Sequence, residues 1–348
     1  MIAASQPRQR PPDARLLSID AQGHIAHWPR QRFIELLRAG DLLVANDAAT
    51  LPASLAGRHE RTGAAIEVRI AQALSLAPGA FGDVAAIVFG EGDWRTTTEA
   101  RPQPPALVVG DRLALGPLRA RVVALRGHPR FVTLRFEGDA ASLWHGLARH
   151  GRPVQYAYLD SPLALWDVWS PLAGPPVALE PASATFVLDW RALAALRARG
   201  VGFATLTHAA GLSSTGDAAL DARLPLDEPY RIPPATARAI GATKAAGRRV
   251  IAVGTTVVRA LEHAGSCEGV VRAGDGLATQ RVGPRTTLRV VDAILSGTHE
   301  RGSSHHALLQ AFTDAGTLAR VDAELEHAGY RTHEFGDSVL VERRATRQ

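Results

Sequence analysis

The sequence predicts an α/β main domain, discontinuous in the chain, with a small antiparallel β-barrel domain inserted into it. The apolar run at 250–253 is followed by Gly254 and a helical pattern through Glu262, a strand–turn–helix unit typical of α/β proteins. From about residue 58 the chain changes to short β-rich segments separated by Gly and Pro turns, which indicates a small barrel or sandwich. We therefore expect a main domain at 1–57 and 151–348 and the insertion at 58–150.

The individual elements follow from the same patterns, in chain order. Asp41-Leu-Leu-Val-Ala45 is expected to form a buried strand of the main domain. In the insertion we expect strands at Ala65–Ile70, Ala85–Phe89, Asp111–Leu115, Ala120–Leu125 and Phe131–Phe136. Helical periodicity returns at Trp190–Arg199, Pro234–Ala246, Ser304–Phe312 and Ala319–Ala328. A closing strand is expected at Ser338–Val341.

Composition restricts the class of protein. The 348 residues include 39 Lys plus Arg and 34 Asp plus Glu, so the formal charge is 39 − 34 = +5 with histidines neutral. Usage of 46% hydrophobic and 21% charged residues excludes a disordered or collagen-like chain. The single cysteine, Cys267, cannot form an internal disulfide, so we expect a cytoplasmic protein. The chain contains neither a recognisable signal peptide nor about 18 successive apolar residues, so we expect no membrane association.

Polar residues follow the first predicted strand. Asn46 and Asp47 stand at its carboxyl end, where open α/β sheets place ligands. An Asx turn or a helix N-cap would use the same residues. Both interpretations stay open on the sequence.

A second polar stretch follows the strand at 250–253. Gly254 permits close backbone approach, and Thr255 and Thr256 place hydroxyls and free amides at a helix start, which suits a carboxylate or a phosphate. Arg259 and Glu262 share a helical face with Thr256. The same stretch is equally typical of a capped helix with a surface ion pair.

The third and fourth stretches lie near the carboxyl terminus. The run from Ser296 to His306 contains His299-Glu300, but the spacing of its next histidine does not fit a zinc-binding helix. We expect a polar loop there, with Ser303 or Ser304 as N-cap of the next helix. Asp337 follows Gly336 in a turn, where local hydrogen bonding is its ordinary role.

Three longer motifs carry a resemblance to a known family. Gly40-Asp-Leu-Leu-Val-Ala-Asn-Asp47 continues to Leu51-Pro-Ala-Ser-Leu-Ala-Gly57, Thr62-Gly precedes Ile66-Glu-Val68, and Arg249-Val-Ile-Ala-Val-Gly-Thr-Thr-Val-Val-Arg-Ala-Leu-Glu262 follows. In this order they resemble motifs of the S-adenosylmethionine:tRNA ribosyltransferase-isomerase family of queuosine biosynthesis. The resemblance spans nearly the whole chain.

Some positions depart from the family pattern. Phe186 replaces a family histidine, and Arg223-Leu-Pro-Leu-Asp-Glu228 retains only Glu228 of the motif H-x-M-H-x-E. Gly297-Thr-His-Glu-Arg-Gly-Ser303 lacks the family's Asn and Lys, although Arg301 supplies a nearby cation. His208 matches the family's T-L-H segment.

The resemblance implies transfer of the ribosyl part of S-adenosylmethionine to the aminomethyl group of a 7-deazaguanine base in tRNA. The ribosyl group is rearranged to an epoxycyclopentanediol, and adenine and methionine leave. A base must remove the proton beside the sulfonium, and a proton donor must assist the loss of adenine. We expect catalytic roles for His208, His299, Asp47 and Glu228. We expect substrate binding by Asn46, Gly254, Thr255, Thr256, Arg259, Glu262, Arg301, Ser303 and Asp337, with Arg259 holding the methionine carboxylate.

The implied partners are S-adenosylmethionine as co-substrate and a tRNA anticodon stem-loop, with no metal and no other cofactor. The target base would stack on Trp166, Trp169 or Tyr156, although each of these aromatic residues also suits core packing. We expect a monomer. Two alternatives stay open: a divergent paralog that binds S-adenosylmethionine and either uses another acceptor, such as a small molecule, or cleaves it, and a non-catalytic RNA-binding module.

Overall fold

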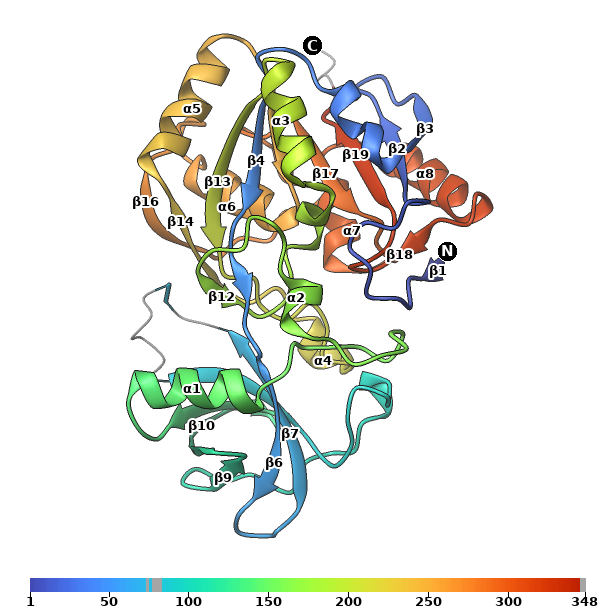
Figure 1. Ribbon diagram of the computed structural model, residues 1–348. Helices are drawn as coiled ribbons and strands as arrows, with labels where there is room; N and C mark the ends of the chain where they lie inside the picture. The colour runs from blue at the N-terminus through green and yellow to red at the C-terminus, as the bar shows by residue number, and fades with distance from the viewer. Residues whose placement is uncertain (73–74, 77–82, 345–348) are drawn as a thin grey trace.

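The computed structural model describes residues 1–72, 75–76 and 83–344. A nine-stranded mixed sheet with helices on both faces forms the upper part of the molecule in Figure 1, and a closed β-barrel lies below it. The predicted combination of an α/β body with an antiparallel barrel is confirmed. Within the described ranges, no helix is long and apolar enough to cross a membrane.

The strand order of the large sheet is β16-β14-β13-β4-β15-β17-β19-β2-β3. In that order the strands are Gly274–Ala278, Glu228–Ile232, Gly202–His208, Leu42–Asn46, Val250–Val253, Ala293–Gly297, Ser338–Glu342, Arg15–Ile19 and Ile25–Pro29. The central strands β13, β4, β15 and β17 run parallel, with Ala45 of β4 opposite both Thr205 and Val253. Their carboxyl ends therefore meet at one edge, and the arrow of β4 in Figure 1 points from the sheet toward the barrel.

Strands β4 and β15 are buried and mostly apolar because both faces of the sheet are covered. Leu43 and Ala45 of β4 belong to the core shared with η1 (Arg30–Leu36) and α3 (Trp190–Ala198). Leu42 and Val44 belong to the core on the other face, shared with α5 (Pro234–Ala245), α6 (Thr255–Ala264) and α8 (Ala315–His327). Alternate side chains of a strand point to opposite faces, so this run anchors a three-layer body.

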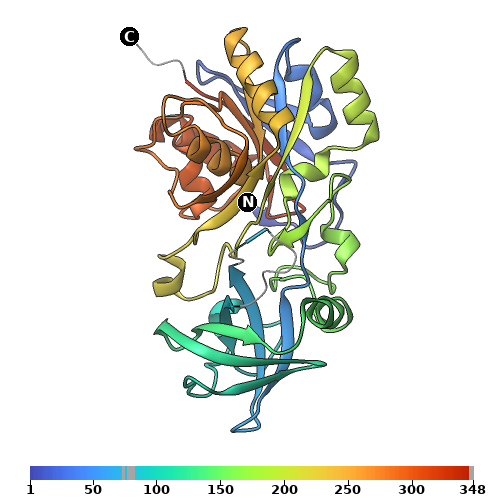
Figure 2. The ribbon, with the colours of Figure 1, turned by 90° about the vertical axis from the view of Figure 1, so that its left-hand side faces the viewer.

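The barrel closes in the order β10-β11-β8-β7-β6-β9, with every pair antiparallel. In that order its strands are Leu118–His128, Phe131–Phe136, Asp83–Phe89, Ala65–Gln72, Ser54–His59 and Arg112–Leu115. Figure 2 shows it from the side, beneath the helices and strands of the larger body. The first barrel strand begins at Ser54, before residue 58, and the division of the chain at 58 and 150 stays a prediction.

The expected elements are present, with shifted ends. The strands Val250–Val253 and Phe131–Phe136 match their predicted bounds. Helix α8 begins before the predicted Ala319, because the Asp314 side chain accepts a hydrogen bond from Thr317 N and caps the helix. Helix α7 (Ser304–Leu309) is shorter than predicted.

Helix α1 (Ala140–His150) was not predicted, although Asp139 caps it through Ser142 N. The remaining short elements are β1 (Ile2–Ala3), β5 (Ala49–Thr50), η2 (Thr98–Ala100), α2 (Leu165–Val168), β12 (Pro176–Ala178), η3 (Ser183–Val187), α4 (Ala218–Asp221) and β18 (Arg331–Thr332).

Candidate active site

Asn46 connects three elements at the carboxyl edge of the sheet. Its Nδ2 donates to the His208 carbonyl at 3.0 Å and its Oδ1 accepts from the His208 amide at 2.9 Å, which ties β4 to β13. The same Nδ2 lies 3.5 Å from Thr256 Oγ1 at the start of α6. Asn46 Oδ1 also accepts from Ala48 N at 3.1 Å, the Asx turn that the sequence left open. Asn46 is fully buried, so it fixes the edge of the site from beneath.

Asp47 is only half-buried and stands one residue further along the chain. Its Oδ1 accepts from Thr207 Oγ1 at 2.7 Å, and its carbonyl accepts from Gly174 N at 2.7 Å. Among the described residues, nothing donates to Asp47 Oδ2. The carboxylate is therefore held in place on one side and available on the other.

The turn between β15 and α6 depends on Gly254. Its φ of 94° and ψ of 156° lie in a region that only glycine occupies readily. No side chain caps α6, so Thr255 and Thr256 stand at a helix start whose backbone amides face away from the helix. Such a start favours a negatively charged group. The geometry agrees with the predicted carboxylate or phosphate site without testing it.

His208, Glu228 and Arg259 form a buried polar cluster behind this edge. His208 Nε2 lies 3.4 Å from Glu228 Oε2, but neither ring nitrogen of His208 makes a hydrogen bond. Burial first, and then the charge of Arg259, lower the pKa of His208 to about 3, so its imidazole is neutral near pH 7. Burial raises the pKa of Glu228, while the adjacent guanidinium of Arg259 opposes that rise.

Arg259 is engaged within the protein. Its Nη1 pairs with Glu228, and its Nε donates to the Gln280 carbonyl at 3.1 Å. Its Nη2 donates to the carbonyls of Leu226 at 3.1 Å and Ala278 at 2.9 Å. These contacts do not favour the prediction that Arg259 holds a methionine carboxylate, because four of its five N–H groups already have acceptors. They explain instead why Glu228 is retained in an otherwise altered motif.

Two predicted binding carboxylates hold backbone amides. Glu262 accepts from the amides of 289–291 at 2.8 to 3.0 Å and makes no surface ion pair with Arg259. Asp337 accepts from Arg15 N at 2.7 Å and from Arg331 N at 2.8 Å and is almost fully buried. Carboxylates that accept several backbone amides stabilise loops. These hydrogen bonds do not favour the prediction that Glu262 or Asp337 binds substrate.

The loop before α7 contains His299, Arg301 and Ser303. His299 Nε2 lies 2.8 Å from Ser296 Oγ, its ring centroid is 4.8 Å from that of His305, and burial lowers its pKa well below the ordinary value. Ser303 is the N-cap of α7 and accepts from His306 N at 3.1 Å. Arg301 pairs with Asp322 at 3.0 Å, with its side chain largely exposed.

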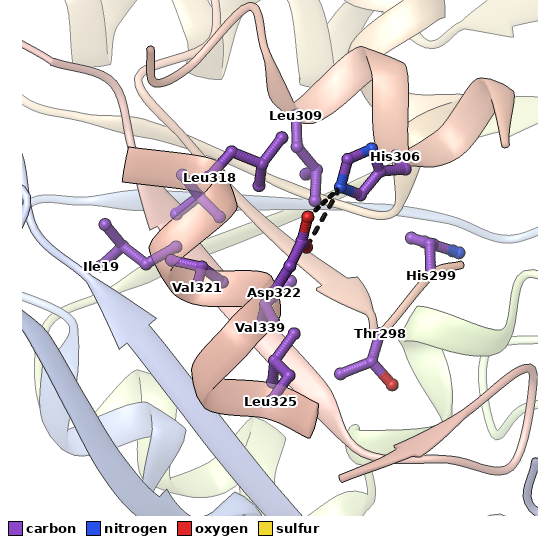
Figure 3. A pocket seen from close by; sticks show the side chains of 11 residues that line it. Ile19, Thr298, His299, His306, Leu309, Leu318, Val321, Asp322, Leu325 and Val339 are labelled. Atoms are coloured by element: carbon purple, nitrogen blue, oxygen red, sulfur yellow. Dashed lines mark hydrogen bonds and ion pairs between the residues drawn. The ribbon is translucent and has the colours of Figure 1, made fainter. Parts of the chain in front are cut away.

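Figure 3 shows the small cavity beside this loop. Asp322 reaches from α8 to His306 on α7, with both oxygens within 3.1 Å of His306 Nε2, and Thr298 and His299 lie at the rim. The cavity holds about 10 Å³, room for one water molecule. It cannot admit a nucleoside. Burial first, and then the charge of Arg259, lower the pKa of His305 to about 4, so this loop lies within electrostatic reach of the buried cluster.

Phe186, which replaces a family histidine, is a core residue here. It is buried and stacks on Phe335 with ring centroids 5.7 Å apart, in a cluster with Ala4, Leu163 and Val168. A phenyl ring in such a cluster packs and cannot titrate. Phe186 therefore packs η3, the short helix that follows β12, against the interior of the protein.

Sequence reasoning missed the buried acid Glu180. Its Oε1 accepts from Tyr156 Oη at 2.5 Å and from Ser213 N at 2.9 Å. Burial raises its pKa to about 7. No motif points to Glu180, because its partners come from segments 24 and 33 positions away.

Comparisons with known proteins agree with this architecture. A sequence model of the family described as "Queuosine biosynthesis protein" matches residues 1–341. A relative named S-adenosylmethionine:tRNA ribosyltransferase-isomerase from Gloeobacter violaceus is 32% identical, over 97% of this chain and 92% of its own. A protein of the same name from Sorangium cellulosum is 31% identical, over 98% of this chain and 95% of its own.

A solved structure supports the fold separately. The crystal structure of the S-adenosylmethionine tRNA ribosyltransferase from Thermotoga maritima matches with a TM-score of 0.51 and 22% identity, over 97% of this chain and 96% of that one. At this identity the likeness shows the fold alone. The whole-length match to the family model and to relatives above 30% identity goes further: this chain belongs to the queuosine biosynthesis protein family.

Proposed function

We propose that this chain transfers the ribosyl part of S-adenosylmethionine to the aminomethyl group of a 7-aminomethyl-7-deazaguanine base in tRNA. In the same reaction it isomerises that group and releases adenine and methionine. The observation that carries the proposal is family membership over nearly the whole chain, with relatives that share the transferase-isomerase name. This favours the main hypothesis over a divergent paralog with another acceptor and over a non-catalytic RNA-binding module.

We propose that the co-substrate binds at the carboxyl edge of β4 and β15. The start of α6, with Gly254, Thr255 and Thr256, takes the methionine carboxylate, because the amides there are not capped by a side chain. Arg259 supports this start indirectly, by keeping Glu228 paired behind it. Asn46 holds β13 and α6 together beneath the ligand.

The proton-accepting role goes to a group that substrate can reach. Asp47 and His299 are both partly exposed, whereas His208 and Glu228 are buried. Asp47 has a free carboxylate oxygen within the described structure, and His299 is an uncharged imidazole at neutral pH. We therefore assign proton abstraction beside the sulfonium to Asp47 or His299 and a positioning role to His208 and Glu228.

We propose that the RNA surface lies on α2 and the segment before β2. Trp166 is 77% exposed, and Gln9 Nε2 holds its helix by donating to the carbonyls of Trp166, Asp167 and Trp169 at 2.8 to 3.2 Å. Exposed arginines at 8 and 10 flank Gln9. Aromatic rings between arginines suit an unpaired base and its phosphates, which favours an anticodon loop as the bound part of the tRNA.

The segment that carries Trp166 is also tied to the site. Trp169 Nε1 donates to the Thr50 carbonyl at 2.9 Å, and Gly174 N donates to the carbonyl of Asp47. A base stacked on Trp166 would thus be held near the strand end that carries Asp47. We further propose that the chain acts as a monomer in the cytoplasm, where tRNA is modified.

Release of adenine and methionine tests the proposal. The chain is incubated with S-adenosylmethionine and either tRNA carrying the 7-aminomethyl-7-deazaguanine base or the same tRNA with guanine, and the products are separated by chromatography. We expect both products only with the modified tRNA. Release without it would favour the alternative that cleaves S-adenosylmethionine or uses another acceptor, and no release in either case would contradict the proposal.

Site variants sharpen the same assay. We expect one of Asp47→Asn and His299→Phe to lower the rate about 100-fold or more, the range of a lost general base. Asp275→Asn removes an exposed carboxylate from β16 and serves as the matched control, with the wild-type rate expected. Wild-type rates in both site variants would remove this pair from the mechanism.

A further inference from the structure

Glu180 is a buried carboxyl group without a cation. Only 8% of the residue is exposed, and its two hydrogen bonds come from neutral donors, the Tyr156 hydroxyl and the Ser213 amide. Within the described residues, no arginine, lysine or histidine side chain forms a hydrogen bond or ion pair with it. A buried carboxylate in such surroundings is costly, so the site favours the protonated acid.

Glu228 provides the contrast in the same part of the fold. The segment after β13 serves both acids, since Gly211 N donates to Glu228 at 2.6 Å and Ser213 N donates to Glu180. Glu228 has the guanidinium of Arg259 as a partner, and Glu180 has a tyrosine. Two acids held in unlike surroundings beside one site commonly take different proton-transfer roles.

The backbone beside Glu180 is held at the carboxyl edge of the sheet, because Leu179 N donates at 2.8 Å to the carbonyl of Ala210, two residues after the end of β13. Four residues after Glu180, Ala184 Cβ is 3.5 Å from the point where Gly254 would carry a Cβ. Tyr156 is half-buried, with its hydroxyl on Glu180 and its ring stacked against Tyr158 at 6.1 Å between centroids. The backbone contact beside Glu180 places the pair next to the carboxyl end of β13, at the sheet edge where we propose that S-adenosylmethionine binds.

The other charged and titratable groups around the pair are few. Arg69 of β7 lies with its Cζ 5.7 Å from the centre of the Tyr156 ring, and its charge opposes the rise in the pKa of Tyr156. Tyr158 donates to Glu334, and the negative charge of Glu334 adds to the rise in the pKa of Glu180 caused by burial.

The histidines near the site do not supply the proton that adenine needs. Burial lowers the pKa of His208 to about 3 and that of His305 to about 4, and the pKa of His299 also falls well below its ordinary value, so all three imidazoles are uncharged near pH 7. Loss of adenine still requires a proton on the leaving base.

We infer that Glu180, acting through the hydroxyl of Tyr156, supplies the proton with which adenine leaves. When the bond from ribose C1′ to adenine breaks, its electron pair stays on adenine. The Tyr156 hydroxyl, which donates to Glu180 and lies 3.3 Å from the Ser214 carbonyl, turns away from both acceptors and gives its proton to the adenine ring. Glu180 then gives its carboxyl proton to the Tyr156 oxygen, and water later reprotonates the Glu180 carboxylate. Tyr156 is then the catalytic residue and Glu180 the positioning acid. The inference rests on the proposed function.

The pH dependence of adenine release in a single turnover tests this role. In the wild type the donor must be protonated, so the rate should fall as pH rises through about 7, the pKa to which burial raises Glu180. Glu180→Gln and Tyr156→Phe should each lower the rate about 100-fold or more and remove the decline with pH. Glu180→Asp, which keeps a carboxyl group, should retain part of the wild-type rate. Glu334→Gln is the matched control, a carboxyl held by the neighbouring Tyr158. It should keep the decline, shifted to lower pH.

A decline at the same midpoint in Glu180→Gln would overturn the inference while leaving the proposed function intact. Wild-type protein that releases no adenine with any tRNA would instead overturn the proposed function. In that event infrared difference titration of wild type against Glu180→Gln still decides on the acid itself. A band of the Glu180 carboxyl that titrates near pH 7 supports its role as a buried acid, and a Glu180 carboxyl already ionised at pH 5 excludes that role.

Discussion

At the scale of single residues, Arg259 determines how charge is arranged behind the site. The spacing of Thr256, Arg259 and Glu262 on one helical face could be read from the sequence. Their partners could not, because Glu228 and the amides of 289–291 are brought in by tertiary structure. A motif thus predicts which residues point the same way but not what they meet.

Removal of Arg259 should destabilise the protein strongly. Arg259→Met leaves Glu228 buried without its cation, and breaking a buried pair on one side costs about 3–5 kcal/mol. Arg231→Met is the matched control on β14, the strand that also carries Glu228, because Arg231 and Asp275 pair with side chains that are 52% and 61% exposed. Urea denaturation should give a large loss of unfolding free energy for the first variant and no measurable change for the second. Equal losses would contradict the buried-pair account.

Acid should destabilise the protein through His208. Its pKa is lowered to about 3 by burial and by the charge of Arg259, whereas an unfolded histidine titrates near pH 6.5. Below pH 6.5 the unfolded chain takes up a proton that the folded chain does not bind. The unfolding free energy should therefore fall with pH between about 6.5 and 3, by up to about 1.4 kcal/mol per pH unit from this residue.

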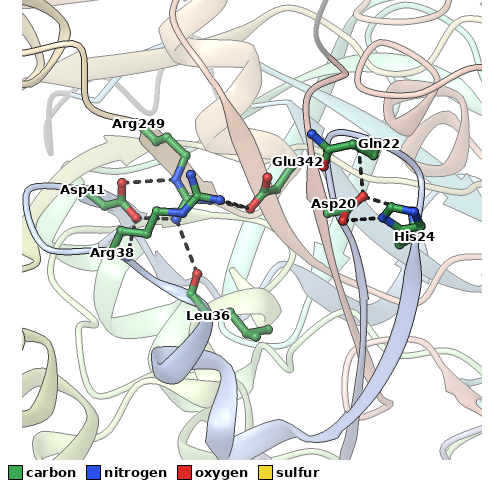
Figure 4. Close-up of polar contacts among 8 residues, drawn as sticks. All are labelled: Asp20, Gln22, His24, Leu36, Arg38, Asp41, Arg249 and Glu342. Carbon is green, nitrogen blue, oxygen red and sulfur yellow. Dashed lines mark hydrogen bonds and ion pairs between the residues drawn. The ribbon is translucent and has the colours of Figure 1, made fainter.

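Denaturation at pH 7 and pH 5 measures this effect. His208→Leu should lose less stability between the two conditions than the wild type. His24→Leu is the control, because His24 pairs with Asp20 on the surface, as Figure 4 shows. The account of His208 would be wrong if the His208 and His24 variants lost the same amount.

At the scale of elements, the turn from β15 to α6 sets the shape of the site. Gly254 takes a backbone conformation that costs other residues about 1–3 kcal/mol. Gly254→Ala should lower the unfolding free energy by that amount and weaken S-adenosylmethionine binding, measured by calorimetry. Gly241→Ala in α5 is the control, since nothing lies within 4 Å of its new methyl group and alanine favours the helix. An unchanged unfolding free energy in Gly254→Ala would contradict the account of a strained turn.

The opposite edge of the sheet is held by a separate ion-pair network. Arg249, just before β15, pairs with Asp41 before β4 and with Glu342 at the end of β19 (Figure 4). Its Nη2 also lies 3.4 Å from the Leu36 carbonyl. The network joins the amino ends of the parallel strands β4 and β15 to the carboxyl end of β19, which pairs antiparallel with β17, and thus supports the sheet from the end away from the site.

The elements themselves were mostly predictable, because hydrophobic periodicity reports burial. Strands β15 and β11 could be read at both ends, and the barrel was predicted from its turns. Helix α1 was not predicted because it lies within a segment that was interpreted as β-strands and turns throughout, although Asp139 provides the N-cap of a helix. Glu180 escaped because its surroundings exist only after folding.

At the scale of the whole molecule, the site edge of the sheet points toward the barrel, and the exposed Trp166 lies on the segment that runs beside it. The logarithm of the tRNA binding constant should fall linearly with the logarithm of the salt concentration, since phosphate contacts release counterions. Trp166→Ala should cost about 1–3 kcal/mol of binding free energy, the value of one stacked base.

Fluorescence titration with the anticodon stem-loop measures both effects. Trp190→Ala, which removes an indole that is 74% exposed at the start of α3, is the matched control and should bind as the wild type does. Equal weakening in both tryptophan variants would count against a stacking site on α2, and binding that ignores salt would count against phosphate contacts.

The most direct test of the central claim follows the ribosyl group itself. S-adenosylmethionine labelled with carbon-13 in the ribose is incubated with the chain and with tRNA carrying 7-aminomethyl-7-deazaguanine, and the nucleosides of the digested tRNA are weighed by mass spectrometry. The account predicts that all the labelled ribose carbons appear on the modified base, in step with adenine release. Labelled ribose found only in small molecules, with the tRNA unchanged, would contradict it.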